Sequence, residues 1–205
     1  MTPPTAHDRP AAPDGTRAPS GRAVRFLRWA AAGMVGPDPS AGEVAATMAS
    51  AVLGTALAAS AAATAGLPAL AVAVAAVVAF DFFGGAAATA TAAAKRRYHG
   101  PGTTPWRRVA FAAAHVQPYL LALCVPALEW WAAALIHLLA VAGACAVAAA
   151  PPVLRPPVAF AAAVLGSAAA LLYLPVPEPL GWLAPVMLIK LLLAHMLPGA
   201  APSEE

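Results

Sequence analysis

The chain has 205 residues, of which 61% are hydrophobic and only 10% are charged, and its mean hydropathy is +0.73. Soluble domains average about 25% charged residues, so this chain has too few charges to keep a folded surface of its size in water. We therefore predict one all-α membrane domain, and the net charge of +3 gives no reason to expect a nucleic-acid partner.

The first 40 residues are predicted to precede the membrane domain. Residues 1–20 are rich in Pro, Ala and polar residues and are predicted to be disordered. Residues 21–33, GRAVRFLRWAAAG, place three arginines among apolar side chains, which suits a short helix on the inner leaflet. A solvated tail that orients the first span is an equally good interpretation. Because this tail is too long for the n-region of a signal peptide, we expect the first span to be retained.

Six apolar runs follow, each close to the roughly 20 residues that a helix needs to cross the hydrocarbon core. They are residues 44–66, 68–94, 108–126, 130–150, 157–175 and 180–197. With the N-terminus in the cytoplasm, eleven of the twelve Lys and Arg residues fall on the inside, and the outer connections hold only Glu129 and Glu178. We predict a multi-pass bundle of about six transmembrane helices over residues 41–198 in the cell membrane. Both termini are expected to be cytoplasmic, with residues 199–205 as a C-terminal tail.

Two charged residues lie deep inside the predicted spans. Asp81 is about midway between Pro68 and Lys95, which at about 1.5 Å per residue places it near the bilayer midplane. Lys190 lies about midway along the run 180–197 and therefore at nearly the same depth. A charge at this depth costs several kcal/mol unless it is neutralised or used. Two interpretations stay open, an ion pair that joins the second and sixth spans and a functional site in a polar cavity.

Small and aromatic residues surround Asp81 in the sequence AFDFFGGAAATA. Gly84 and Gly85 follow three and four residues later and share its helix face. That face either packs closely against another helix or makes room for a bulky ligand. Phe82 and Phe83 either face lipid or present aromatic faces to a substrate.

The stretch HVQP, which begins at His115, is the second candidate site. Pro118 frees the backbone carbonyl of Ala114, and polar irregularity at membrane depth is tolerated where it is buried or lines a wet cavity. His115 is a candidate catalytic residue, although a lone intramembrane histidine more often forms a hydrogen bond with a neighbouring helix. Cys124 and Cys145 have neither redox nor zinc spacing, and no motif indicates a metal or cofactor.

A small, helical membrane chain with isolated acidic residues resembles the membrane terpene cyclases of meroterpenoid and prenylated-indole pathways, in general plan and size over residues 40–198. The resemblance implies an enzyme that folds a polyprenyl chain within the bundle and starts cyclisation by protonation, without a metal. Asp81 is the expected proton donor, because desolvation keeps a carboxylic acid neutral. His115 is expected to orient or reprotonate it. The expected substrate-binding residues are Gly84, Gly85, Phe82, Phe83 and Lys190. A charged Lys190 beside Asp81 would spoil this acid, and His115 or Glu129 would then have to serve.

Two other classes of protein remain open. A small proton-coupled transporter would use Asp81, Lys190 and the histidines as a relay, but the chain has no evident internal repeat and few polar residues for a solute path. A non-catalytic membrane subunit would need only a filled bundle in which Asp81 and Lys190 are paired. An apolar, one-ended pocket that reaches Asp81 would favour the enzyme. Membrane lipid and a lipophilic small molecule are the expected partners, and the sequence leaves the oligomeric state open.

Overall fold

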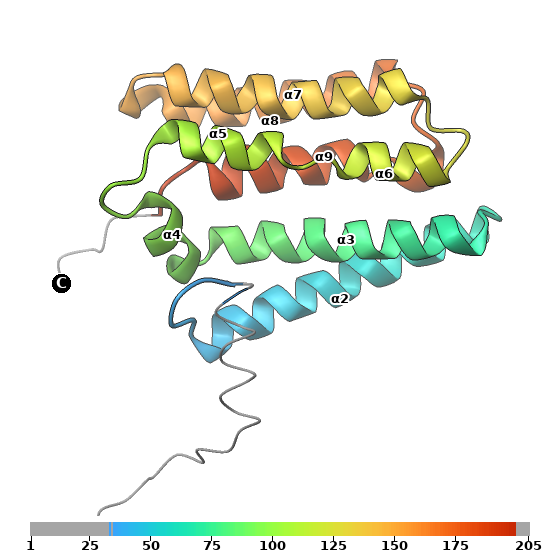
Figure 1. Cartoon of the computed structure of the whole chain (residues 1–205), viewed down its shortest axis with the longest axis horizontal. Helices are drawn as coiled ribbons and strands as arrows, with labels where there is room; N and C mark the ends of the chain where they lie inside the picture. The colour runs from blue at the N-terminus through green and yellow to red at the C-terminus, as the bar shows by residue number, and fades with distance from the viewer. Residues whose placement is uncertain (1–32, 34, 200–205) are drawn as a thin grey trace, which may run out of the picture.

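The computed structural model describes residues 33 and 35–199. In this part of the chain every regular element is helical and none is a strand, which confirms the all-α prediction. Figure 1 shows the long helices running side by side in one bundle. The predictions for the N-terminal tail, including nearly all of the basic segment 21–33, and for residues 200–205 lie outside the described residues.

Five helical segments of the described chain are long and apolar enough to cross a membrane, so this is a membrane protein. They are α2 (Ala41–Thr64), α3 (Ala69–Ala90), α7 (Trp130–Ala149), the segment Pro152–Tyr173 and the segment Glu178–His195. Each overlaps one of the six predicted spans. The remaining predicted span is the third, and the structure interrupts it.

Helices α2 and α3 pack closely through small residues. A reciprocal capping box starts α2, in which the Glu43 amide donates to Ser40 Oγ over 3.2 Å and the Ser40 amide donates to Glu43 Oε2 over 2.7 Å. A Cβ added at Gly54 would lie 2.1 Å from the ring of Phe83, so only glycine fits there. Ser50 Oγ also donates to the Phe83 carbonyl over 2.8 Å. This is the small-residue packing that membrane helices use.

Helix α3 ends at Ala90, four residues before the end of the predicted span. The Thr91 side chain accepts a hydrogen bond from the Ala94 amide over 3.1 Å and so begins the basic helix α4 (Ala92–His99). The cationic end of the second span is therefore a separate short helix, and Figure 1 shows α4 at one end of the bundle.

The prediction that residues 108–126 form one continuous span is wrong. This stretch forms two short helices, α5 (Pro105–Ala113) and α6 (Gln117–Cys124), and both pack against α7. His137 of α7 fills the break, because its Nε2 donates to the Ala113 carbonyl over 3.1 Å while its Nδ1 accepts from the Tyr119 hydroxyl over 3.1 Å. The first of these bonds satisfies a backbone carbonyl that the helix break would otherwise leave unpaired in an apolar medium.

The last span is the central element of the bundle. The short turn η1 (Pro152–Leu154) leads into α8 (Arg155–Tyr173). Then η2 (Glu178–Leu180), α9 (Leu183–Leu188) and the π-helix η3 (Ile189–His195) form the last segment. In the segment Glu178–His195, 56% of the residues are buried, against 22–39% in the four other helical segments of membrane-crossing length. The reason is that this segment packs against α3, α7 and α8. Lys190 is thereby carried into the interior.

Candidate functional site at the centre of the bundle

Asp81 of α3 and Lys190 of η3 form an ion pair. Lys190 Nζ lies 2.7 Å from Asp81 Oδ2 and 3.2 Å from the Asp81 carbonyl oxygen. The lysine side chain is 2% exposed, whereas that of the aspartate is 46% exposed. The contact between the second and last spans, one of the two interpretations of the sequence, is therefore present. The unequal exposure of the partners means that the carboxylate remains reachable from outside the pair.

Two further groups hold the pair in place. Gln117, the first residue of α6, donates from Nε2 to Asp81 Oδ2 over 3.1 Å. Lys190 Nζ lies 5.1 Å from the centre of the Phe82 ring, a cation–π distance. Both donors converge on Oδ2, and among the described residues Oδ1 receives no hydrogen bond. The carboxylate thus keeps one oxygen for another partner.

Lys190 is the second residue of the π-helix η3. The Met196 amide donates to the Leu191 carbonyl over 3.2 Å, five residues back along the chain. The wider π turn changes the face on which the side chains of this segment emerge, and π-helical turns occur frequently at functional sites. Lys190 and the fully buried His195 both belong to this segment. Apolar periodicity could not have indicated it.

The glycines beside Asp81 make room for protein atoms. A Cβ added at Gly85 would lie 2.6 Å from Lys190 Cε and 2.8 Å from its Nζ. A Cβ added at Gly84 would lie 2.8 Å from the Cβ of Ala51 on α2. Gly85 therefore lets the lysine side chain pass across α3 to the carboxylate, and Gly84 lets α2 approach. Of the two sequence interpretations of this face, close packing explains both contacts.

We expect Gly85→Ala to destabilise the protein by about 1–3 kcal/mol, since overpacking pushes the lysine off its partner. Gly42→Ala is the matched control, because nothing lies closer than 4.0 Å to the added Cβ. In the first turn of α2 that substitution should be neutral or slightly stabilising. Denaturation of both variants in mixed micelles checks the difference. Equal stabilities would contradict the packing of Lys190 over Gly85.

Asp81 borders a small cavity between α2 and α3. Its volume is about 260 Å³, slightly below the range usual for small-molecule sites. The lining residues are Gly33, Thr47, Phe80, Asp81, Gly84, Gly85 and Ala88. The Thr47 hydroxyl is buried and has no hydrogen-bond partner. The cavity combines a carboxylate, glycine backbone and one aromatic ring.

Phe82 and Phe83, the expected aromatic neighbours of Asp81, do not line this cavity. Phe82 is fully buried and its ring centre is 6.4 Å from that of Trp182. Phe83 wedges against Gly54, with its ring centre 5.6 Å from Trp182. Phe80, which precedes Asp81 in the sequence but is not among the expected substrate-binding residues, is the phenylalanine that lines the cavity. Residues 80 and 84 share a helix face with a one-turn spacing, and that spacing was the available signal.

His115 lies near the site and does not hydrogen-bond to Asp81. Its Nδ1 donates to the Phe111 carbonyl over 2.7 Å, and its ring centre is 6.4 Å from that of Phe82. The hydrogen bond closes the end of α5. His115 therefore has a local structural contact, and it lies on the side of Phe82 that leads toward the α4 end of the bundle.

An aromatic stack continues from His115 to α4. The ring centres of Phe111 and His195 are 4.1 Å apart, and those of Tyr98 and His195 are 4.6 Å apart. Both ring nitrogens of His195 are buried without a hydrogen-bond partner. A buried imidazole of this kind calls for an explanation such as a bound water.

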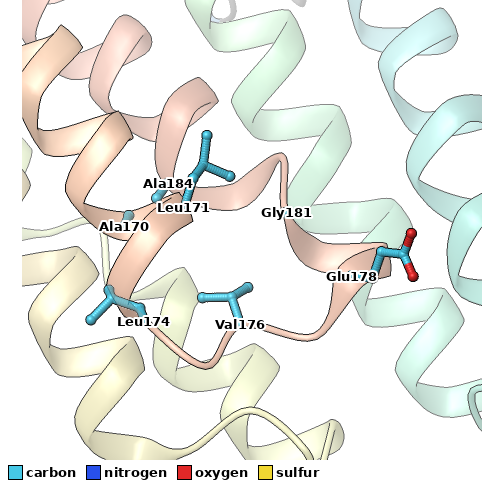
Figure 2. Close-up of a pocket in the computed structure, with 7 residues that line it drawn as sticks. All are labelled: Ala170, Leu171, Leu174, Val176, Glu178, Gly181 and Ala184. Carbon is cyan, nitrogen blue, oxygen red and sulfur yellow. The ribbon is translucent and has the colours of Figure 1, made fainter.

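Three other cavities lie apart from Asp81, and one of them, of about 420 Å³, is lined by Thr64 of α2 and Glu178 of η2. A second, of about 330 Å³, sits at the connection from α8 to η2, where Figure 2 shows Leu174 and Val176 together and Glu178 apart from them. The third, of about 290 Å³, is a purely apolar groove that includes Val77 of α3 and Leu123 of α6. None of the three is lined by a residue of the ion pair.

Together these features define a helical membrane protein with an ion pair between its second and last spans. Comparison with protein families, with curated proteins and with solved structures finds no match to this chain. Within residues 33 and 35–199, no three His, Cys, Asp or Glu side chains come together in a way that could hold a metal ion.

Proposed function

We propose that this chain is an integral membrane enzyme that acts on a lipophilic, isoprenoid-type substrate at the Asp81 cavity. The observation that carries the proposal is the asymmetry of the ion pair. Lys190 is enclosed, whereas Asp81 is 46% exposed, borders a cavity and has one oxygen to which no described residue donates a hydrogen bond. A pair that served only to join two helices would have no need for an accessible partner. Intramembrane ionisable groups in such a position mark functional sites by default.

Lys190 and Gln117 both donate to Oδ2, so this oxygen acts as an acceptor and has a charged donor 2.7 Å away. Asp81 is then suited to take a proton from the substrate at Oδ1, or to stabilise positive charge that develops on an isoprenoid chain. Initiation of cyclisation by Asp81 as an acid would first require protonation of the pair, which Lys190 opposes. We therefore place proton abstraction ahead of proton donation.

A non-catalytic membrane subunit is the second candidate, and the ion pair itself favours it. Breaking such a pair destabilises a protein strongly whether or not the pair does chemistry. The two candidates differ in what the exposed oxygen does, so product formation separates them.

The test of the proposal is a comparison of lipid extracts. The chain is expressed in a host that supplies polyprenylated precursors, beside the empty vector and a Glu178→Gln variant. Glu178 is an exposed carboxylate at the start of η2 that does not line the Asp81 cavity, so its loss should leave products unchanged. New or rearranged isoprenoids in both the wild type and this control support the enzyme. Extracts identical to the empty vector, together with proton uptake by proteoliposomes, would instead support a transporter.

We further propose a multi-pass topology in the cell membrane, with the α4 end on the cytoplasmic side. The positive-inside rule places the basic loop inside, since Lys and Arg gather in cytoplasmic loops. Reporter fusions after Gly66, Leu128 and Pro177 should read as outside, and those after Gly100 and Arg155 as inside. A cytoplasmic reporter at Pro177 would contradict six crossings.

A further inference from the structure

Four basic side chains gather at the α4 end of the bundle. This basic cluster consists of Lys95 and His99 of α4, Arg108 of α5 and Arg155 at the start of α8. It lies away from the Asp81 cavity, and the proposed catalytic function does not use it.

Each member of the basic cluster is anchored to backbone. Lys95 Nζ donates to the carbonyls of Ala194 and Leu197, and His99 Nε2 donates to the His195 carbonyl over 2.9 Å. Arg108 Nη1 donates to the Tyr98 carbonyl over 3.2 Å, and Arg155 Nε donates to the Ala150 carbonyl over 3.2 Å. These carbonyls belong to the ends of three helical segments, where positive charge is favourable. The side chains are therefore held in place before any ligand arrives.

The cluster has no counter-ion among the described residues, in which the one ion pair joins Asp81 to Lys190. Its members also lie close enough together to repel one another. Burial and, secondly, the charge of Arg108 together lower the pKa of Lys95 to about 8. Burial lowers the pKa of His99 too, with the charges of Arg108, Lys95 and Arg155 as additional causes.

Arg108 is the best-defined member of the cluster. Its side chain is 7% exposed, and its Nε is buried without a hydrogen-bond partner in the part of the chain that the structure describes. A guanidinium carries five N–H donors in a planar fork, and Nη1 supplies the hydrogen bond to Tyr98. Burying such a cation without an opposite charge is costly. The arrangement is one that an anion with several acceptor oxygens would complete.

We propose that the basic cluster is a binding site for a phosphate or diphosphate group. Arginine binds phosphate oxygens in a bidentate manner, and two arginines with a lysine and a histidine nearby suit a multiply charged anion better than a single carboxylate. The group can belong to the headgroup of a lipid or to a soluble phosphate. The experiment below separates these two sources.

The test uses thermal unfolding of the full chain in phosphatidylcholine nanodiscs. One arm adds sodium diphosphate, with sodium chloride of equal ionic strength as the reference, and the other replaces part of the phosphatidylcholine with phosphatidic acid. A ligand that binds the folded state raises the Tm with its concentration. We expect a rise in at least one arm. A rise with phosphatidic acid alone identifies a lipid headgroup, and a rise with diphosphate alone identifies a soluble anion.

Variants of the basic cluster show whether the anion binds at these residues. Arg155→Gln and Arg108→Gln should weaken the response by roughly tenfold in concentration, which corresponds to one charge-assisted hydrogen bond. Arg107→Gln is the matched control, because Arg107 precedes Arg108 in α5, is exposed, and should respond as the wild type does. If Arg108→Gln fails to fold, Arg155→Gln is the variant that tests the site, because Arg155 is only half-buried at the start of α8. No rise above the chloride reference with diphosphate, together with no rise above pure phosphatidylcholine with phosphatidic acid, overturns the proposal, as does an undiminished rise in Arg155→Gln.

Discussion

Replacing Asp81 with asparagine is expected to lower the free energy of unfolding by about 3–5 kcal/mol, because it leaves the Lys190 ammonium uncompensated in the interior. Lys190 is 2% exposed, and its ammonium has no other anionic partner among the described residues. Asparagine has nearly the same volume as aspartate, so the loss reports charge rather than packing. Denaturation in mixed micelles measures it.

The reverse substitution should cost less. Lys190→Met leaves a carboxylate that is 46% exposed and still accepts a hydrogen bond from Gln117. An exposed carboxylate costs less to leave unpaired than an enclosed ammonium does. The double variant Asp81→Asn/Lys190→Met should approach wild-type stability, since removing both partners of a buried pair is often nearly neutral. Strictly additive losses in the double variant would show that the two residues are not coupled in the folded protein.

Loss of the Asp81 carboxylate is also expected to reduce turnover of an isoprenoid substrate by about 10²–10⁴-fold, the usual contribution of a general acid or base. Asparagine keeps the shape of the side chain and cannot take up the proton. Asp81→Glu should retain part of the activity, because it keeps a carboxylate displaced by one methylene. The measurement is the amount of product per folded protein in cells that supply polyprenylated precursors.

The control for folding comes from the ion pair itself. Asp81→Asn alone is expected both to destabilise and to inactivate, so its inactivity would not separate the two effects. The double variant Asp81→Asn/Lys190→Met is expected to fold as the wild type does and still to lack activity. A stable double variant with an unchanged product profile would eliminate Asp81 as a catalytic residue. A stable but inactive double variant would exclude a purely structural role for the pair.

Much of the fold could be predicted because hydropathy and helix rise are local properties of the chain. The apolar runs predicted the positions of five long helices, and the 1.5 Å rise predicted that Asp81 and Lys190 lie at matching depths. Small residues at one-turn spacing predicted a face at Gly84 and Gly85 that either packs closely or admits a ligand, and the structure shows close packing there. These inferences needed no knowledge of which helices are neighbours.

Tertiary structure decided the rest, because the missing information lies in partners distant in sequence. The third span breaks fully between Ala113 and Gln117, and His137 of α7 satisfies the exposed carbonyl, whereas the proline alone predicted only an irregularity. Apolar periodicity also cannot distinguish α-helical from π-helical hydrogen bonding, so the π-helical segment that contains Lys190 was not predictable. The sequence by itself determined the class of protein and the depth of its charges. The packing of the last span at the centre of the bundle determined that those charges meet, and that the carboxylate alone stays accessible.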